Sequence, residues 1–459
     1  MFRRVAIIGG GAAAAALLSE LLEHRPARPL HLDWYTGGGR AGRGVAYGTD
    51  SPRHLLNVRA ASMSMFAGRP RGFLDYAQQG DPSVAGTDFL PRRLYGDYLE
   101  AEVARALAQA RASGIDVRVM PFAVDALVPE SDGVTVLQGE ESRRVDAAVL
   151  ALGALPAQPL AGVEDEAIAG GGYVVDPWAF LAQVRPDPSP REVVLIGLGL
   201  TAVDVLLELS AQWPNARFTA ISRHGLLPEA HRASAAVPAD DGGSLVEAMR
   251  EAPGIRPWMR LLREATAASR DWRPVIDSLR PHTAALWAEL PRDERARFLR
   301  HARWAWERIR HRLPPQINEA IAALEQDGRL QRRRGRVQSV RRGDGGRLQL
   351  QVSHAGGAPV PLQADLVIQT VGLDTDVRRT PHPLVRQLVT NGHVMPDPLG
   401  MGMQASADGR LLHEGKPWER LFAMGSLLRG TLWESTAMPE IRQQARGLAD
   451  RLLGDQPAR

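Results

Sequence analysis

The sequence predicts an α/β fold made of two similar units and a helical segment between them. A strand–glycine turn–helix pattern occurs twice, once around residue 9 and again around residue 197. Each pattern is followed, much later, by several short strands and an apolar strand that ends in glycine, at Gly153 and Gly372. Two copies of one plan indicate two related domains. We therefore expect two Rossmann-like dinucleotide-binding domains, each with a β-meander, plus a helical insertion.

The domain boundaries follow from these repeats. The chain has 459 residues, 44% of them hydrophobic and 24% charged, which is typical of a globular protein with two or three domains. We expect the first unit in residues 1–185 and the second in residues 186–235 and 331–372, with residues 373–459 as the last segment of the chain. Residues 236–330, which are rich in Arg, Glu, Ala and Trp at helical spacing, would form the insertion.

The first glycine loop is Gly9-x-Gly11-x-x-Ala14, between an apolar strand and a helix of small residues. Gly9 permits a tight turn, Gly11 lets the backbone approach a pyrophosphate, and Ala14 lets the helix pack closely on the strand. The helix N-terminus would then present free N–H groups and a positive dipole end to the phosphates. An ordinary apolar β-turn-α connection is the alternative, but the strand before and the helix after favour a nucleotide site.

The second strand of this unit lacks an acid at its tip. Such an acid normally binds a ribose hydroxyl. Asp33 lies inside the predicted strand, which ends at Tyr35 and Thr36. We expect Thr36 to take the hydroxyl, more weakly than a carboxylate would.

The second loop is Gly197-x-Gly199-x-x-Ala202, with Thr201 beside it and a strand at 193–196 before it. Its spacing gives these glycines the roles assigned to Gly9 and Gly11. The next strand ends in Ser222 and Arg223 instead of an acid.

An arginine at this strand tip favours NADPH over NADH. A carboxylate would repel the 2′-phosphate, whereas Arg223 would pair with it. The alternative is that Arg223 is an ordinary solvated arginine.

Composition excludes several classes of function. The formal net charge is only +4, and Lys416 is the single lysine among 56 basic residues. The densest basic run, Arg332 to Arg334, is short and lacks interleaved aromatics, so we expect a solvated turn and no nucleic-acid partner. The chain has no cysteine, which excludes disulfides, iron–sulfur clusters and a redox-active dithiol. No carboxylate or histidine cluster suggests a metal.

No apolar run is long enough to span a bilayer. The basic and apolar start superficially resembles a signal peptide, but Gly9, Gly10 and Gly11 interrupt it and charged residues follow from Glu20 to Arg25. We expect a cytoplasmic protein without a membrane partner.

The chain resembles a bacterial family of FAD/NAD(P)-binding proteins (YdhS-like), which is distantly similar to class B flavin monooxygenases and amine N-hydroxylases. The stretches that carry this resemblance occur in order along nearly the whole chain: GRGVAYGT (42–49), HLLNV (54–58), FLPRRLYGDYL (89–99), GLGLTAVD (197–204), SRHGLLPEAH (222–231), RHRLPP (310–315) and GTLWESTAMPEIRQQA (430–445). Thr36 departs from the acid usual in the family.

The resemblance implies that residues 1–185 and 373–459 form one FAD-binding domain and that residues 186–235 and 331–372 form an NADPH-binding domain. It also implies further FAD contacts. Gly44, Tyr47 and Asn57 would lie near the flavin, and Gly425 with Trp433, Glu434, Ser435 and Thr436 would close over it. The residues themselves add one argument. Ser435 and Thr436 are N-cap types and Pro439 suits a first helical turn, so a helix starting there would direct its positive end at the reduced flavin.

The function expected is that of an FAD-dependent oxidoreductase reduced by NADPH, of the monooxygenase type, which oxygenates a small amine-like nucleophile. Alternatives are a reductase or dehydrogenase acting on a small organic acceptor, and a non-catalytic nucleotide sensor. The sequence does not decide whether O2 or another molecule accepts the electrons, and it specifies neither the substrate nor the oligomeric state. No acid–base pair stands out. His224 and His231 are candidates for cofactor or substrate contacts, and Arg310, His311 and Arg312 are candidates for an anionic substrate pocket or a capped helix C-terminus.

Overall fold

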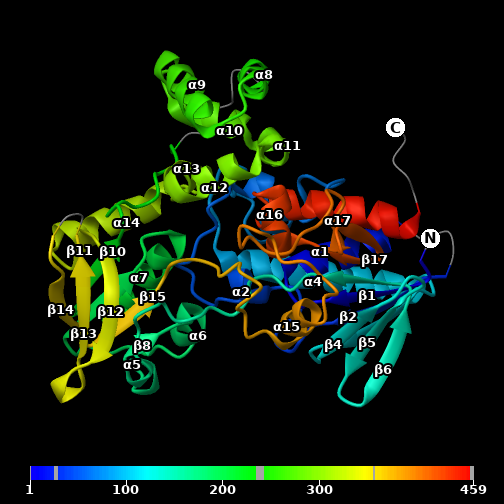
Figure 1. The fold of residues 1–459 in the computed structure, drawn as a ribbon, viewed down its shortest axis with the longest axis horizontal. Coiled ribbons are helices and arrows are strands. Elements are labelled where there is room, and N and C mark those ends of the chain that lie inside the picture. The colour runs from blue at the N-terminus through cyan, green and yellow to red at the C-terminus, as the bar shows by residue number, and fades with distance from the viewer. Residues whose placement is uncertain (1, 25–28, 234–241, 355–356, 455–459) are drawn as a thin grey trace.

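The computed structural model describes residues 2–24, 29–233, 242–354 and 357–454. Two α/β units stand side by side, and a group of helices projects above their junction (Figure 1). Each unit is built on its own parallel sheet and carries its own three-stranded meander. The expected fold class, with two Rossmann-like units and a helical insertion, is confirmed.

The first sheet has the strand order β16-β17-β7-β1-β2-β3, and only the β16–β17 pair is antiparallel. Its strands are β1 (Arg4–Ile8), β2 (His31–Tyr35), β3 (Asp116–Met120), β7 (Ala147–Leu150), β16 (Arg410–His413) and β17 (Lys416–Ala423). The chain therefore returns to this sheet after residue 400, as expected for a domain formed from both ends of the sequence.

Alternate residues of β1 pack on opposite faces of this sheet. Val5 and Ile7 pack with α1 (Ala12–Glu23), α4 (Arg92–Ala112) and α17 (Met438–Leu453). Ala6 and Ile8 pack on the other face. That face is covered by α15 (Pro383–Thr390) and by the meander of β4 (Ala126–Pro129), β5 (Val134–Gln138) and β6 (Glu141–Val145). A strand buried on both sides explains the continuous apolar run that the sequence shows.

The second sheet has the order β11-β10-β9-β15-β8, with every neighbouring pair parallel. Its strands are β8 (Tyr173–Val174), β9 (Arg191–Ile196), β10 (Ala216–Ser222), β11 (Leu330–Arg334) and β15 (Leu366–Gln369). Helices α7 (Leu200–Gln212) and α14 (Pro315–Gln326) cover one face. The meander of β12 (Arg336–Arg342), β13 (Leu348–Ser353) and β14 (Val360–Ala364) covers the other.

Two details of the second unit differ from expectation. The run Arg332 to Arg334 is not a turn but part of β11, which pairs in parallel with β10. In addition, β8 joins this sheet although it precedes residue 186, and α14 packs on its face although it precedes residue 331. Both exceptions arise because edge strands and covering helices are assigned by tertiary packing, which short local patterns do not specify. The expected boundary at 235/236 lies outside the described residues.

The helical insertion consists of α8 (Gly243–Glu251), α9 (Ile255–Ala268), α10 (Trp272–Ser278), α11 (Thr283–Glu289), α12 (Arg292–His301) and α13 (Arg303–Arg310). It rises above the junction of the two units (Figure 1). Trp287 is buried between helices, as expected for a packing residue, and its ring lies 4.9 Å from that of Trp433. Trp304 instead stacks on His224, with ring centroids 3.9 Å apart.

A buried polar cluster joins the two units. Arg92 on α4 forms an ion pair of 2.9 Å with Asp204 on α7, and the backbone carbonyl of Asp204 accepts a bond from the His54 ring at 3.2 Å. Thr49 bonds the other nitrogen of His54 at 2.7 Å. Four of the stretches that carry the family resemblance, GRGVAYGT, HLLNV, FLPRRLYGDYL and GLGLTAVD, thus meet at this interface.

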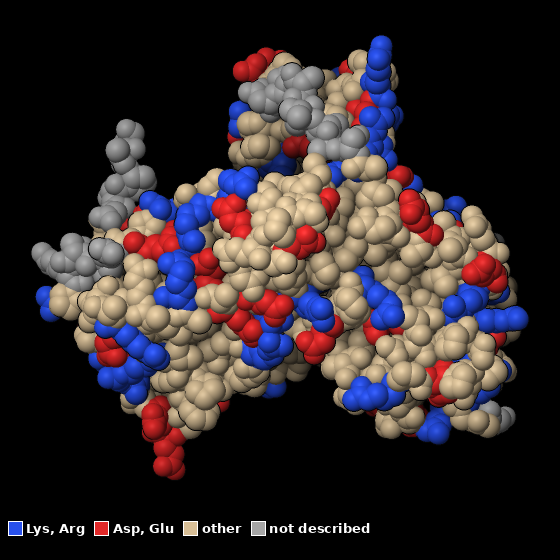
Figure 2. All heavy atoms as spheres, turned by 180° about the vertical axis from the view of Figure 1, so that it is seen from behind, with Lys and Arg blue, Asp and Glu red and all other residues tan. Residues whose placement is uncertain are grey.

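Short helices complete the fold: α2 (Gly44–Tyr47), α3 (Gly72–Gly80), α5 (Asp165–Ala169), α6 (Pro177–Leu181) and α16 (Arg429–Leu432). Within the described ranges, no helix combines the length and apolar character needed to cross a bilayer. Basic and acidic side chains are interspersed over the face shown in Figure 2, without a single dominant basic field.

Candidate functional site

The first glycine loop has the backbone that the sequence predicts. Gly9 has φ +131°, and a Cβ there would lie 2.2 Å from the carbonyl oxygen of Ala151 in the neighbouring strand connection. The Gly9 N–H donates to the carbonyl of Tyr35 at 2.8 Å. Ala14 is fully buried where α1 packs on the sheet. Both positions therefore exclude larger residues.

Three glycines converge at the N-terminus of α1. Gly11 is the N-cap and no side chain caps the helix, so the first N–H groups are left to a ligand. A Cβ on Gly44 would lie 3.1 Å from the Cα of Gly11. Gly425 (φ +73°) faces the first turn of α1, because its Cβ would lie 3.9 Å from that of Ala13. These glycines, which lie far apart in the sequence, surround one place.

The tip of β2 does not carry a free acid. Asp33 is buried beside Arg143, with Nε and Oδ2 4.0 Å apart, and burial raises the pKa of its carboxyl. Thr36 is also buried, and its hydroxyl donates to the Met120 carbonyl at 3.4 Å. The donor that would bind a ribose oxygen is therefore partly engaged within the protein.

The second loop repeats this design. Gly197 has φ +117°, and a Cβ there would lie 2.4 Å from the Thr370 carbonyl oxygen. Gly199 is the uncapped N-cap of α7, and a Cβ on it would meet no atom within 4 Å. Ala202 is fully buried, whereas Thr201 is half-buried in the first turn. The space beside Gly199 is thus open to a phosphate.

Basic residues gather at the adjoining strand tips. Arg223 follows β10 and is exposed, and Arg334 ends β11 in register with Ser222. Neither guanidinium has a hydrogen bond or ion pair with the described residues. The Ser222 hydroxyl accepts the Gly225 N–H at 2.9 Å and thereby holds the turn. His224 lies between the two arginines; burial, and then the positive charges of Arg223 and Arg334, lower its pKa. In the sequence, Arg334 stands out only as the end of a basic run, and the pairing of β11 with β10 is what places it here.

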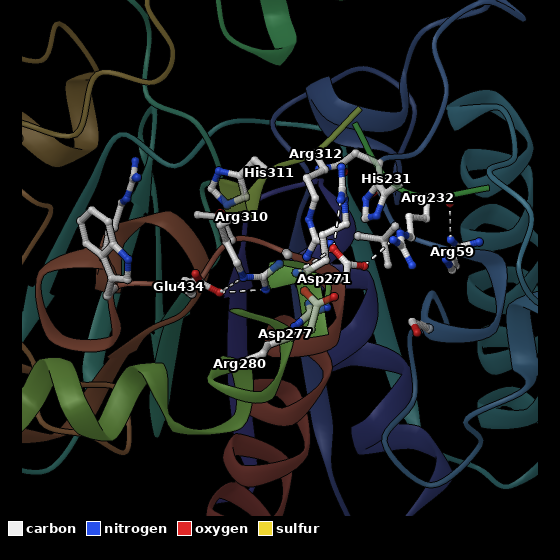
Figure 3. Close-up of a pocket in the computed structure, with 18 residues that line it drawn as sticks. Arg59, His231, Arg232, Asp271, Asp277, Arg280, Arg310, His311, Arg312 and Glu434 are labelled. Carbon is white, nitrogen blue, oxygen red and sulfur yellow. Dashed lines mark hydrogen bonds and ion pairs between the residues drawn. The ribbon is translucent and has the colours of Figure 1, made fainter. Parts of the chain in front are cut away.

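A pocket of about 270 Å³ opens where all three parts of the molecule meet. The first unit contributes Asn57 and Thr436, the segment after β10 contributes His231, and the insertion contributes Arg280 and Arg312. Figure 3 shows the charged side chains of this pocket converging from these elements. Two sets of residues singled out in the sequence line this pocket. Those expected near the flavin are Asn57, Trp433, Glu434 and Thr436, and those expected near a substrate are Arg310, His311 and Arg312.

The wall of this pocket is rich in arginine. Seven arginines and three acids line it: Arg59, Arg232, Arg273, Arg280, Arg310, Arg312 and Arg429, with Asp271, Asp277 and Glu434. Of these residues, only Arg310, Arg312 and Glu434 belong to motifs singled out in the sequence. The others are brought together by tertiary structure, and no spacing signal identifies them.

Both histidines of the pocket are held neutral. Burial lowers the pKa of His231 to about 4, assisted by the charge of Arg312, while its ring bonds the Asn57 carbonyl at 3.1 Å. Burial and the charge of Arg310 lower the pKa of His311. The positive charge here therefore comes from arginine and changes little near neutral pH. His224 lies elsewhere, beside the second loop.

The segment before α17 closes one side of the pocket. Trp433 is buried with φ +52°, and Glu434 accepts bonds from Trp306 at 3.1 Å and from Arg310. Ser435 is fully buried, and its hydroxyl has no partner among the described residues. The N-cap expectation is wrong: α17 begins at Met438 with Ala437 as an N-cap that supplies no side-chain bond. Pro439 does lie in the first turn.

Tyr47 lies apart from the pocket. Its ring packs edge-on against Tyr95 at 4.6 Å, and burial raises its pKa to about 12. The ring thus supports the turn that presents Gly44.

The described residues fit a dinucleotide at each loop. Apolar side chains, which would otherwise be costly to expose, lie at both places. Phe122 is 57% exposed beside the tip of β2, and Val45 is 54% exposed next to Gly44. Val371 and Leu373 are about half exposed just after Thr370, which adjoins Gly197. Exposed apolar side chains beside phosphate-binding turns suit the flat rings of FAD and NADPH. Among the described residues, no group of three or more His, Asp or Glu could hold a metal ion.

Part of the first unit is similar to a known protein family. Residues 6–155 match the model of a family described as FAD-NAD(P)-binding. This stretch is similar to FAD-NAD(P)-binding proteins. It contains the first glycine loop, β1 to β7 and the turn at Gly44. The uncharacterized protein YdhS of Escherichia coli (strain K12) is 25% identical over 264 residues, which are 50% of this chain and 47% of that protein. The match therefore spans about half the length of this relative.

Two solved structures share the fold of nearly the whole chain. An ornithine N-hydroxylase of Kutzneria sp. 744, in complex with reduced FAD, NADP+ and L-ornithine, is 16% identical with a TM-score of 0.65. An L-lysine 6-monooxygenase of Pseudomonas syringae is 17% identical with a TM-score of 0.65. Each superposition covers 98% of this chain and 99% of the other. The arrangement is thus that of flavoproteins with two dinucleotide-binding domains.

Proposed function

We propose that this protein is an FAD-dependent oxidoreductase reduced by NADPH, of the monooxygenase type, which oxygenates a small amine-like nucleophile. The observation that carries this proposal is the pocket at the junction of both dinucleotide units and the insertion. A substrate there would lie beside both cofactors. The fold shared with amine monooxygenases supports the same reaction class.

The first loop suits FAD and the second suits NADPH. Gly11, Gly44 and Gly425 bring both ends of the chain around one loop, and the family match covers the same loop. At the second loop, two exposed arginines at the strand tips suit a 2′-phosphate, because a guanidinium binds phosphate through two parallel hydrogen bonds.

Bound FAD would supply the redox chemistry, taking a hydride from NADPH and passing electrons to O2 or another acceptor. The protein's own residues bind and orient the cofactors and the substrate, and they exclude water from the pocket. Thr436 and Ala437 place the uncapped N-terminus of α17 at the pocket, where its positive end stabilises negative charge. Buried Trp433 and the partly buried Arg310–Glu434 ion pair, with a nitrogen–oxygen distance of 2.9 Å, close the wall on the insertion side. Without cysteine, electrons have no dithiol exit.

The test is to purify the protein, record its spectrum and follow NADPH oxidation with and without oxygen. We expect a yellow protein that releases FAD on acid precipitation, and whose NADPH oxidation is coupled to oxygen uptake. A colourless protein that fails to bind added FAD would contradict the proposal. If the rate of NADPH oxidation does not depend on oxygen but increases when an organic acceptor is added, the result would instead support a reductase.

A further inference from the structure

The ion pairs around the junction pocket leave a surplus of positive charge. Asp271 is shared by Arg232 and Arg273, each at 3.1 Å, and Glu307 is shared by Arg303 and Arg429 at 2.9 and 2.8 Å. The remaining pairs are one to one: Arg280 with Glu440, Arg310 with Glu434 and Arg312 with Asp277. Among the described residues, these ion pairs thus set seven arginines against five carboxylates.

Arg312 is the most telling member of this set. It is only 2% exposed, lines the pocket, and pairs with Asp277, while its Nε has no partner among the described residues. A buried guanidinium with an unused donor is costly unless a ligand completes its hydrogen bonds. Burial lowers the pKa of Arg312, Arg59 and Arg429, and neighbouring arginines add to this effect. The pocket wall therefore holds buried guanidinium groups in excess of its carboxylates.

We propose, on the basis of the function above, that the substrate is a net anion with at least one carboxylate or phosphate group, and that Arg312 and Arg59 bind this group. A cationic amine without such a group is repelled by the surplus charge. An amine that also carries acidic groups fits both the expected oxygenation of an amine and the positive charge of the arginines in the pocket wall. The two histidines are neutral near pH 7, so the selection rests on the arginines.

The test measures binding to the FAD-loaded protein by calorimetry, without NADPH and in low-salt buffer free of phosphate. Three five-carbon probes differ in their end groups and therefore in charge: glutarate (dianion), 5-aminopentanoate (zwitterion) and 1,5-diaminopentane (dication). Glycerol 3-phosphate separates a preference for phosphate from one for carboxylate. We expect glutarate or glycerol 3-phosphate to bind at least about tenfold more tightly than 1,5-diaminopentane, as expected for one charge-assisted hydrogen bond gained.

Two variants and one control assign the binding to the pocket. Arg312→Gln should weaken binding of the anion about tenfold or more. Because Arg312 is buried, Arg59→Gln provides a second, half-buried position with the same expected loss. Arg217→Gln, at an exposed site on β10 that does not line the pocket, should bind as the unmodified protein does.

Equal binding of the three probes, preference for the dication, no binding of either anion, or loss of anion binding in neither pocket variant would overturn the proposal. No turnover is needed. A protein that fails to oxidise NADPH yet selects anions refutes the proposed function only, whereas an active enzyme that prefers 1,5-diaminopentane refutes this inference only.

Discussion

At the scale of single residues, glycines were the most predictable part of the site. The spacing of Gly9 and Gly11 predicts the turn, and the structure shows why Gly9 is required: φ is +131° and a carbonyl oxygen occupies the place of a Cβ. Arg334 could not be predicted, because its role depends on the pairing of β11 with β10. Thr36 was correctly placed at the tip of β2, but its hydroxyl bonds Met120.

The strand-tip arginines make a prediction about cofactor choice. Replacing Arg223 or Arg334 with Ala should weaken NADPH binding by about 1.5–3 kcal/mol, the range for hydrogen bonds to charged groups, and leave NADH nearly unchanged. Dissociation constants for both cofactors measure this. Arg217→Ala is a matched control, since it is exposed at the opposite end of β10. Equal losses for NADH and NADPH would show that neither arginine contacts the 2′-phosphate.

His231 predicts a change of stability with pH. Its folded pKa of about 4 lies below the ordinary value of 6.5. Between these values the unfolded chain binds a proton that the folded chain does not, so stability falls as pH decreases through this window. The groups around the ring are Arg312, Arg59 and Asp277. His231→Gln should remove up to about 2 kcal/mol of this pH dependence. Denaturant midpoints at pH 7 and pH 4.5 measure it, and equal slopes for both proteins would contradict it.

At the scale of elements, strands and helices with strong local patterns were predicted, and those defined by packing were not. The apolar runs of β1 and β9 and the helices after each glycine loop lie where expected. The charged run of β11 is a strand only because it adds to the edge of β10. The start of α17 was misplaced because Ser435 and Thr436 have cap-forming side chains, yet Ser435 is buried in the turn before the helix.

The contact between α4 and α7 makes a prediction about stability. Asp204 is buried, burial raises its pKa, and Arg92 is its cation. Arg92→Met should destabilise the protein by about 3 kcal/mol, because a buried charge loses its partner. The double variant Arg92→Met/Asp204→Asn should recover part of the loss. Arg93→Met, at the exposed neighbouring position, is the control. If the double variant is less stable than Arg92→Met alone, the ion pair is not the cause.

At the scale of the whole molecule, the repeat of one plan was readable from the sequence and the pocket was not. Two glycine loops and two meanders in the sequence predict two units, and the structure has both. The pocket needs segments near residues 57, 231, 277, 312 and 436, which only the complete fold brings together (Figure 3). Local spacing carries no record of such distant contacts, so Asp271, Asp277 and Arg280 could not be singled out beforehand.

The central claim is that two separate cofactors bind, FAD at the first loop and NADPH at the second. Gly199→Val tests it most directly, because its backbone suits any residue and its Cβ would enter open space, so the fold should be unchanged. Gly11→Val is its counterpart, with φ −93° and a nearest contact of 3.5 Å. We predict that Gly199→Val stays yellow and is bleached by dithionite but reacts slowly with NADPH, whereas Gly11→Val is purified without FAD. Loss of FAD from Gly199→Val with retention in Gly11→Val would reverse the assignment, and no effect of either substitution would contradict the account.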